Sequence, residues 1–377
     1  MRFVFVSTMY GVPWGGSEEL WSQAASRLNK DGHEVMASVI FWPKLSPKVV
    51  ALKKCGVKIS THSSRNCGTI QRFFHKIAGG PKRDFERISK FRPDLVIISQ
   101  GDNHDGLDCM NFCCKSGLPF VAILQCNSEL WWPGDDITED LTKAYRAARK
   151  VFCVSRNNLE LLERQIAEDL TKGMVAWNPF NVPSGPPPAW PEDTGIWRLA
   201  CVARLDPTAK GQDLLFRILA LPKWRDRAIE VNLYGGGLCE LNLRKLAEHM
   251  QLNMVHFRGH VDNVAAIWAQ NHLLILPSRF EGLPLALVEA MWCGRPAIVT
   301  DIAGNAEMCI DGETGFVAAA PAFGLLEETL ERAWVQRHEW QEMGNAARAR
   351  AEKLIPKDPI NEFCQQLLAS ASNAKLE

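Results

Sequence analysis

One segment near the middle of the chain interrupts the pattern of secondary structure on both sides of it. Residues 183–195 read P-S-G-P-P-P-A-W-P-E-D-T-G, a composition that sustains neither a helix nor a strand. Before and after this segment, short apolar runs typical of buried parallel strands alternate with stretches of helical periodicity. This alternation predicts two doubly wound α/β domains, over residues 1–183 and 196–355. We expect residues 356–377 to form a final helix that packs back on the N-terminal domain.

The overall composition excludes several classes of protein. The 377 residues are 46% hydrophobic and 23% charged, which is ordinary for a soluble globular protein with two cores. Lys+Arg and Asp+Glu both number 43, so net charge gives no indication of a nucleic-acid partner. No apolar run approaches the roughly eighteen residues of a membrane span, and the first run is too short for a signal peptide. Twelve cysteines without a C-x-x-C pair argue against a zinc site and favour a reduced, cytoplasmic protein.

The stretch Arg279–Gly294, R-F-E-G-L-P-L-A-L-V-E-A-M-W-C-G, has the pattern of a ligand site. It follows a strand-like run, and a helix is predicted from Leu285 to Cys293. The N-terminus of a helix presents unpaired N–H groups and a positive dipole end, which suits an anion. Glu281 precedes this helix and Glu289 lies about two turns into it. A carboxylate on so apolar a helix needs a partner, which sugar or ribose hydroxyls could supply.

Two cations follow a predicted strand in the second series. Arg204 and Lys210 come after the strand over residues 197–203 and before the next helix. Fixed cations at such a place can neutralise a diphosphate and stabilise it as it departs. Each alone is more typical of a solvated surface side chain, but together with Glu281–Pro284 and Glu289 they favour an anion site. Gly235-Gly236-Gly237 lacks the G-x-G-x-x-G spacing and indicates only a loop near a nucleotide.

Glycines and polar side chains also mark the ends of strands in the first series. Gly15 and Gly16 precede Ser17, a predicted N-cap, and either approach a ligand or simply form a turn. Gln100–Asp105 and Gln125–Glu129 follow two strands, at the edge where α/β sheets bind ligands. Trp131-Trp132 suits stacking against a sugar, although tryptophans are as often packing residues.

A basic region lies between these segments. Arg65–Arg92 interleaves basic residues with phenylalanines and isoleucines. This pattern is typical of a surface that contacts an anionic membrane or an acidic acceptor. It is equally compatible with an ordinary pair of amphipathic helices whose charges are solvated.

Several segments of the second half, taken together, resemble the donor half of family-4, GT-B-type retaining glycosyltransferases. They match in order and spacing across nearly all of residues 197–317. The segments are R-L-D-P-T-A-K-G (Arg204–Gly211), Y-G-G-G (Tyr234–Gly237), F-R-G-H-V-D-N-V (Phe257–Val264), P-S-R-F-E-G-L-P-L-A-L-V-E-A-M-W-C-G-R-P-A-I-V (Pro277–Val299) and E-M-C-I-D-G-E-T-G-F-V (Glu307–Val317). The first half resembles the family more loosely, through G-G-S-E (Gly15–Glu18), V-F-C-V-S (Val151–Ser155) and N-P-F-N-V (Asn178–Val182).

This resemblance implies a fold and an activity. The fold would be two Rossmann-like domains facing each other across a cleft. The activity would be transfer of a sugar, with retention of configuration, from a UDP- or GDP-linked donor to a glycan, lipid-linked or small-molecule acceptor. No metal cofactor and no protein nucleophile would be needed, because the departing phosphate would accept the proton of the acceptor. Such a protein would be cytoplasmic, or peripheral to the membrane through Arg65–Arg92.

The resemblance also implies roles for individual residues. Arg204 and Lys210 would hold the pyrophosphate, and Glu281 would bind hydroxyls of the donor sugar. Glu289 would bind the ribose. The remaining donor contacts would be phosphate-binding Gly16, Gly282, Leu283 and Pro284, Gly235 in the loop near the nucleotide, and Phe257 and Arg258 near the base.

The sequence departs from the family on the acceptor side. Family members often carry a histidine after the strand that corresponds to residues 119–124, where this chain has Gln125-Cys126-Asn127. His104, one strand earlier, is either its substitute or a surface histidine. We therefore expect the acceptor to meet His104, Gln125 and Asn127. A sugar-nucleotide epimerase of the same fold and a catalytically silent sugar-nucleotide-binding protein remain alternatives.

Overall fold

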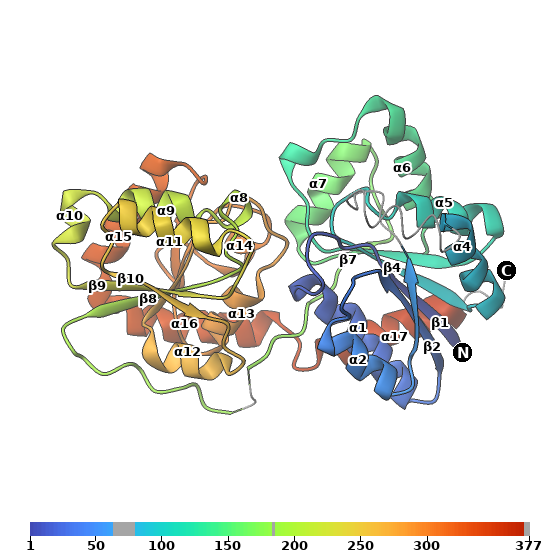
Figure 1. Ribbon diagram of the computed structural model, residues 1–377, viewed down its shortest axis with the longest axis horizontal. Helices are drawn as coiled ribbons and strands as arrows, with labels where there is room; N and C mark the ends of the chain where they lie inside the picture. Colours follow the sequence, from blue (N-terminus) through green and yellow to red (C-terminus); the bar gives the residue numbers. More distant parts are fainter. Residues whose placement is uncertain (63–79, 183–184, 373–377) are drawn as a thin grey trace. The chain divides into compact units, whose positions relative to one another are not determined.

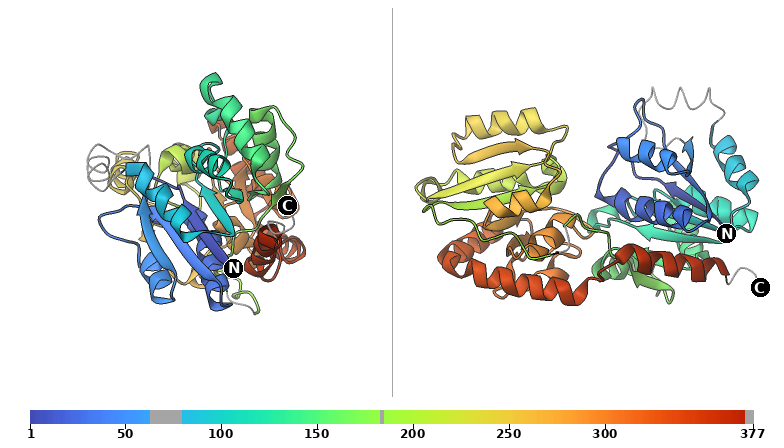
Figure 2. Two further views of the ribbon diagram at one scale, coloured as in Figure 1. Left: turned by 90° about the vertical axis from the view of Figure 1, so that its right-hand side faces the viewer. Right: turned by 90° about the horizontal axis from the view of Figure 1, so that it is seen from below.

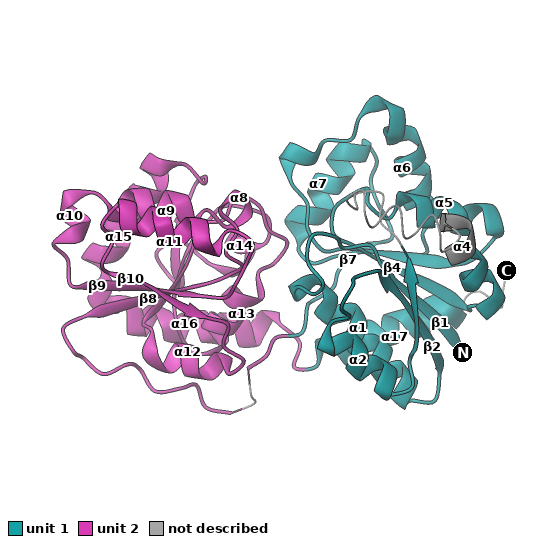
Figure 3. Ribbon diagram, viewed as in Figure 1, with its two compact units in different colours: residues 1–179, 358–377 teal, residues 180–357 magenta. Residues whose placement is uncertain are grey.

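The computed structural model describes residues 1–62, 80–182 and 185–372, with side chains from residue 85 onward in the second range. The chain folds into two compact units, Met1–Pro179 with Asp358–Glu377, and Phe180–Lys357 (Figure 3). Each unit is a parallel sheet with helices on both faces (Figure 1). The predicted class of two Rossmann-like domains is therefore confirmed. No described helix is both long and apolar enough to cross a membrane.

Unit 1 contains a seven-stranded parallel sheet in the order β3-β2-β1-β4-β5-β6-β7. Its strands are β1 (Arg2–Ser7), β2 (Glu34–Ile40), β3 (Lys58–His62), β4 (Leu95–Gln100), β5 (Phe120–Leu124), β6 (Val151–Cys153) and β7 (Gly173–Val175). Its described helices are η1 (Gly16–Glu18), α1 (Glu19–Lys30), α2 (Pro47–Lys54), α4 (Gly80–Phe91), α5 (Leu107–Ser116), η2 (Glu129–Trp131), α6 (Asp135–Ala147), α7 (Arg156–Ile166) and α17 (Pro359–Ser372).

The central strands of unit 1 are buried on both faces. Phe3 and Phe5 of β1 join the core beneath α1 and α17, whereas Val4 and Val6 join the core beneath α5, α6 and α7. This alternation explains why β1 is apolar at each of the four positions from Phe3 to Val6 rather than at every second one.

The C-terminal helix belongs to unit 1. Helix α17 lies beside α1 (Figure 2, right). Phe363 packs edge-on against Phe152 of β6, with ring centroids 5.0 Å apart. Arg149 also donates a hydrogen bond to the Ser370 carbonyl. The last helix therefore completes the core of the first unit.

Unit 2 contains a six-stranded parallel sheet in the order β10-β9-β8-β11-β12-β13. Its strands are β8 (Trp197–Val202), β9 (Ile229–Tyr234), β10 (Val255–Gly259), β11 (Leu273–Leu276), β12 (Ala297–Thr300) and β13 (Gly315–Ala318). Its helices are α8 (Pro207–Lys210), α9 (Gln212–Leu219), α10 (Pro222–Arg225), α11 (Glu240–His249), α12 (Val264–Gln270), α13 (Leu285–Trp292), α14 (Asn305–Met308), α15 (Phe323–Val335), η3 (Arg337–Glu339) and α16 (Trp340–Leu354). Helices α9, α11 and α15 cover one face, and α12, α13 and α16 cover the other (Figure 1).

The proline-rich segment, which the sequence predicts to separate the two domains, contacts unit 2. The two units divide at Pro179, so the described part of residues 183–195 belongs to unit 2. The buried guanidinium of Arg295 donates hydrogen bonds to the carbonyls of Pro188 and Ala189, and it lies over the Trp190 ring at 4.9 Å. These contacts hold the segment against unit 2, and sequence composition alone cannot reveal them.

Candidate functional site

In the sheet of unit 2, the direction in which the chain adds strands reverses between β8 and β11. These strands are neighbours, and the chain continues from β8 toward one edge of the sheet and from β11 toward the other. Loops that diverge in this way leave a crevice at the carboxyl ends of the strands, where α/β folds bind ligands. Arg204 and Lys210 follow β8, and Glu281 follows β11. The structure thus brings to one place residues more than 70 positions apart in the sequence.

Lys210 and Glu281 form a largely buried ion pair. The Lys210 ammonium lies 2.6 Å from Oε1 of Glu281, and their side chains are 16% and 6% exposed. The Ser278 hydroxyl donates a second hydrogen bond to the same oxygen, at 2.7 Å. A buried ion pair with this additional support holds both groups in fixed positions.

The loop that carries Lys210 is locked against the loop that carries Glu281. The Arg279 guanidinium makes two hydrogen bonds to Asp213, at 2.7 and 2.8 Å, and a third to the Pro207 carbonyl. Burial opposes ionisation of Asp213, but the hydrogen bonds and charge of Arg279 outweigh it and hold the pKa of this carboxyl below its usual value. Neither residue could be assigned a role from the sequence, because Arg279 and Asp213 lie 66 positions apart.

Gly211 allows these two loops to approach closely. Its φ is +66°, and a Cβ at this position would lie 1.9 Å from the Pro277 carbonyl oxygen. Any other residue would therefore push the β8 and β11 loops apart.

Helix α13 begins beside this ion pair without a side-chain cap. Its N-cap is Pro284, and no side chain accepts a hydrogen bond from its first turn. Gly282 and Leu283, just before it, are buried, and the Gly282 carbonyl accepts a hydrogen bond from the Gly304 amide at 2.9 Å. Since the positive end of the helix dipole lies here, this turn suits an anion.

Glu289 lies inside α13 and is 5% exposed. Its Oε1 accepts a hydrogen bond from the Asn181 amide at 3.0 Å. Nearby, Phe180 packs against Trp292, with ring centroids 4.5 Å apart. The N-P-F-N-V segment is therefore attached to the helix that carries both the glutamate and the uncapped turn.

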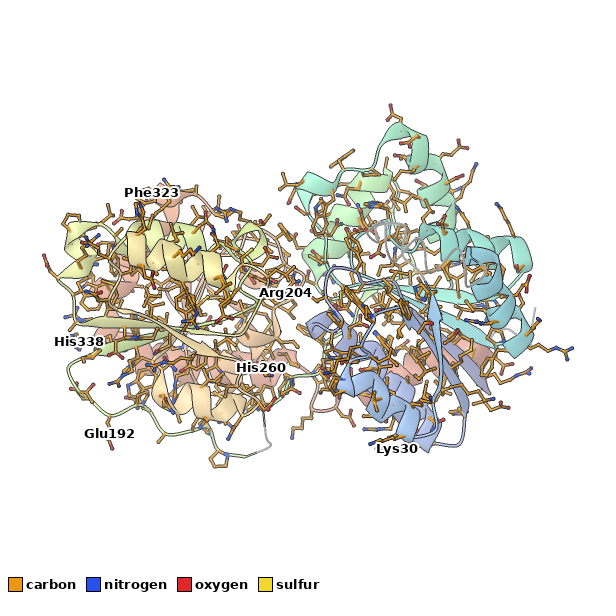
Figure 4. The ribbon with its side chains drawn as sticks, viewed as in Figure 1. Lys30, Glu192, Arg204, His260, Phe323 and His338 are labelled. Atoms are coloured by element: carbon orange, nitrogen blue, oxygen red, sulfur yellow. The ribbon has the colours of Figure 1, made fainter. Side chains whose placement is uncertain are left out.

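The remaining residues of unit 2 that were expected to bind the donor follow β8 and β9 or lie on β10. Arg204 (labelled in Figure 4) has a side chain that is 47% exposed, 3.9 Å from Asp206. Gly235 has φ +125°, and a Cβ there would lie 2.2 Å from the Ala203 carbonyl.

Phe257 and Arg258 lie on β10, two strands from β8. Phe257 packs against Phe216, and the Arg244 guanidinium lies over its ring. Arg258 is exposed and donates to the Asn232 amide oxygen at 2.7 Å.

In the sheet of unit 1, the direction in which the chain adds strands reverses between β1 and β4. Gly16 begins η1 in the loop after β1, and Glu18 ends it. Both carboxylate oxygens of Glu18 lie 2.9 Å from the Ser7 hydroxyl. Complete burial raises the pKa of Glu18 to about 7, although the hydrogen bond from Ser7 opposes this change.

His104 lies at the same edge, in the loop after β4. Its Nδ1 is 3.2 Å from Oδ1 of Asp102 and 2.9 Å from the amide oxygen of Asn103. Tyr10, from the loop after β1, donates to the other oxygen of Asp102 at 3.2 Å. Asp102 belongs to the polar segment Gln100–Asp105, and its contact with His104 could not be predicted from the sequence.

Gln125 and Asn127 are buried rather than presented at the surface. They are 5% and 2% exposed. Gln125 accepts a hydrogen bond from the Asn178 amide, and Asn127 donates one to Gln165. Both side chains therefore support the loops at the ends of β5 and β7, and an acceptor contact for them stays a prediction.

The basic region is only partly described. Residues 63–79 and the side chains of residues 80–84 lie outside the described part of the chain, so Arg65, Arg72 and Lys76 are not placed. Arg87 of α4 donates to Ser60 and to the Thr61 carbonyl, at the end of β3. Among the described residues, no group of three or more His, Cys, Asp or Glu side chains is arranged to hold a metal ion.

Most of the second unit is similar in sequence to a family of known proteins. Residues 197–332 match the family model of glycosyl transferases group 1. An uncharacterized 41.2 kDa protein in the cps region of Klebsiella pneumoniae is 28% identical over 167 residues, 44% of each chain. An uncharacterized glycosyltransferase of Methanocaldococcus jannaschii is 30% identical over 172 residues, 45% of each chain. These matches therefore span less than half of either curated relative.

The fold extends further than the sequence similarity. The crystal structure of Anabaena HepE in complex with UDP and glucose superimposes with a TM-score of 0.75, covering 98% of this chain and all of the other, at 16% identity. At that identity the similarity establishes the fold, which is of the GT-B type. Residues 197–332, which carry the Lys210–Glu281 pair, therefore match the model of glycosyl transferases group 1, in a chain with two Rossmann-like units.

Proposed function

We propose that this protein transfers a sugar from a nucleotide-sugar donor to an acceptor and that unit 2 binds the donor. The observation that carries the proposal is the buried Lys210–Glu281 pair at the β8–β11 crevice, beside the uncapped start of α13. A cation, a carboxylate and a free helix N-terminus together match a diphosphate joined to a polyhydroxylated ring. The family match of residues 197–332 supports the same reading.

The chemistry required of the donor site is stabilisation of a leaving group. The oxygen of an acceptor hydroxyl forms a bond to the anomeric carbon, and the bond from that carbon to the diphosphate breaks. The electron pair of the broken bond stays on the diphosphate, whose charge Lys210, Arg204 and the N-terminus of α13 would stabilise. We propose that the departing phosphate oxygen receives the hydroxyl proton, on the face that retains configuration. No metal ion is part of this proposal.

The two glutamates would recognise the neutral parts of the donor. Glu281, oriented by Lys210 and Ser278, would accept hydrogen bonds from hydroxyls of the transferred sugar. Glu289, oriented by the Asn181 amide, would accept them from the ribose. Phe257 and Arg258 would lie near the base of a UDP- or GDP-linked sugar, with Gly235 in the adjoining loop, and Gly16 of unit 1 would approach the phosphates. Contact of Arg65–Arg92 with an anionic membrane stays a prediction.

The test compares the turnover of variants at the Lys210–Glu281 pair with the turnover of a control variant at another ion pair of unit 2. Purified protein is incubated with UDP- and GDP-sugars and candidate acceptors, and nucleotide release is measured. Glu281→Ala and Lys210→Ala should each lower turnover about 100-fold or more, because both groups act on the donor. The control is Lys223→Ala, which removes an ion pair between α10 and Glu327 of α15 and should leave turnover within about twofold.

A structural effect of the single substitutions must be separated from a functional one. Removing one partner of a buried pair leaves the other without compensation and destabilises the fold. The double variant Lys210→Met/Glu281→Leu removes both charges, so it should melt near the wild-type temperature while staying inactive. Wild-type turnover in this variant would disprove the assignment. Nucleotide release without any acceptor-dependent product would instead favour a hydrolytic or binding protein.

A further inference from the structure

The β12–α14 segment, residues 300–305, contacts the turn that carries Glu281. Thr300 ends β12 and is fully buried. Its hydroxyl donates a hydrogen bond to the Ser278 carbonyl at 2.7 Å. The hydroxyl of Ser278 donates in turn to Oε1 of Glu281, also at 2.7 Å. Thr300 therefore lies directly behind the residue that holds the Glu281 carboxylate.

A second contact joins the same segment to the same turn. The Gly304 amide donates a hydrogen bond to the Gly282 carbonyl at 2.9 Å, just after Glu281 in the sequence. Asn305 is also fully buried, and its side-chain nitrogen donates to the Thr300 carbonyl at 3.1 Å. The β12–α14 segment is thus closed by a hydrogen bond between its ends. It is attached to the turn both before and after the glutamate.

The backbone of the β12–α14 segment contains a strained residue. Ala303 has a φ of +49°, in the left-handed region that residues other than glycine rarely occupy. Among the described residues, the other non-glycine residues with positive φ are Arg92, Ala167 and Gln251. All three lie within two residues of the end of a helix, where a left-handed residue is common. Ala303 instead lies between a strand and a helix, so the hydrogen bonds around it must hold its conformation.

The contacts of Glu281 leave one of its two oxygens for a ligand. Oε1 accepts hydrogen bonds from both Lys210 and Ser278. In the part of the chain that the structure describes, no donor pairs with Oε2. A carboxylate held through one oxygen can turn only by losing these charge-assisted bonds. The place of Oε2 is therefore set by the turn on which Ser278 and Glu281 lie.

We propose that the β12–α14 segment orients Glu281 and that Thr300 and Ala303 are positioning residues of the donor site. Thr300 fixes the Ser278 carbonyl, and the left-handed Ala303 directs the next backbone amide at the turn. Neither residue touches the donor. Both act on the hydroxyls of the transferred sugar through Glu281, and neither acts on the nucleotide. This inference rests on the proposed transfer activity, and it assigns a role to residues that the donor does not contact.

The experiment separates sugar recognition from nucleotide recognition in the full chain. Wild type is titrated by calorimetry with UDP- and GDP-sugars and with free UDP and GDP, and the nucleotide sugar that binds best is used with its nucleotide. Thr300→Val removes the hydroxyl and keeps the shape of the side chain. It should weaken binding of the nucleotide sugar about tenfold and leave binding of the free nucleotide within about twofold. Thr300→Ser, which restores the hydroxyl, should recover the wild-type affinity.

Ala303 tests the same contact without loss of a hydrogen-bonding group. Ala303→Val opposes the left-handed backbone and should weaken only the nucleotide sugar, whereas Ala303→Gly adopts this φ freely and should bind as wild type does. The control Ala167→Val introduces the same strain at φ +52° in unit 1 and should change neither affinity. A second control, Thr329→Val, removes a buried hydroxyl of unit 2 that donates to the Leu325 carbonyl at 2.8 Å, and it should also change neither.

The outcomes distinguish this inference from the donor proposal. Equal weakening of the nucleotide sugar and the free nucleotide by Thr300→Val and Ala303→Val would overturn the positioning role, because the loss would then be general. Wild-type affinities in both variants would also overturn it. If Thr300→Val does not fold, Ala303→Val decides. A wild type that binds no nucleotide sugar would refute the proposed function itself. If the Lys210→Met/Glu281→Leu variant loses the donor but the variants of the β12–α14 segment keep it, only the positioning role is wrong.

Discussion

The buried carboxyl of Glu18 should make the stability of unit 1 depend on pH in a way that one substitution removes. Glu18 is 4% exposed, and the Ser7 hydroxyl lies 2.9 Å from both of its carboxylate oxygens. Its surroundings include Met9, Val39 and Trp42, which line the same small hollow. Burial therefore raises the pKa from 4.5 to about 7.

The size of the effect follows from this change. Because the pKa is higher in the folded state than in the unfolded one, the folded state holds the proton more tightly. The contribution of the protonated Glu18 carboxyl to the free energy of unfolding is fully present below pH 4.5 and is lost as the pH rises to about 7. The loss amounts to about 3 kcal/mol, because each unit by which the pKa rises corresponds to about 1.36 kcal/mol. Glutamine cannot ionise, so Glu18→Gln should escape this loss.

The assay is the difference in melting temperature between Glu18→Gln and wild type, measured by calorimetry at several pH values. For a unit of this size about 3 kcal/mol corresponds to roughly 6–12 °C. The two proteins should melt at similar temperatures near pH 4.5, and the variant should melt higher by that amount at pH 8. Glu34→Gln, at an exposed site beside Lys58, controls for a general change in charge. A Glu18→Gln difference that stays constant between pH 4.5 and pH 8 would refute the reasoning.

Two further substitutions test how unit 2 is built. Gly211→Ala should lower turnover about 100-fold, because its Cβ would displace the Pro277 loop. The control is Gly312→Ala, at φ +77° with no atom within 4 Å of the added Cβ. This control should lose only about 1 kcal/mol of stability and should keep its turnover. Equal turnover in these two glycine variants would contradict the close approach. Arg295→Met should destabilise unit 2 by about 3–5 kcal/mol in guanidinium unfolding, because it leaves the carbonyls of Trp268, Asn271 and Ala189 without their donor. A loss below 1 kcal/mol would show that water replaces the guanidinium.

The strands were predictable because their burial leaves a continuous apolar signal. The strand predicted over residues 197–203 is β8, and the helix predicted from Leu285 to Cys293 is α13, which ends one residue earlier, at Trp292. Helix α5 gives a weaker signal, since its sequence L-D-C-M-N-F-C-C-K-S contains few strong helix formers and its stability comes from packing Met110 and Cys113 into the core. Helix α2 has a recognisable start signal, because Ser46 as N-cap is followed by Pro47.

The candidate site was predictable only in part, because its residues come together through the sheet. Arg204, Lys210 and Glu281 could be selected from their positions after predicted strands. The Lys210–Glu281 contact and the Arg279–Asp213 clamp could not be selected, since each joins residues 71 or 66 positions apart. In unit 1, Asp102 and His104 are close in sequence, but their geometry depends on the backbone of the loop after β4.

The proposed function requires that Lys210 and Glu281 bind a nucleotide sugar at the carboxyl ends of β8 and β11. The most direct measurement is isothermal titration of UDP-glucose and GDP-mannose into wild type, the Lys210→Met/Glu281→Leu double variant and Lys223→Ala. We expect saturable binding of at least one of these donors by wild type and by Lys223→Ala, and affinity lower by about 100-fold or more in the double variant. Equal affinity in all three proteins would contradict the proposed function, because the donor would then bind without the ion pair.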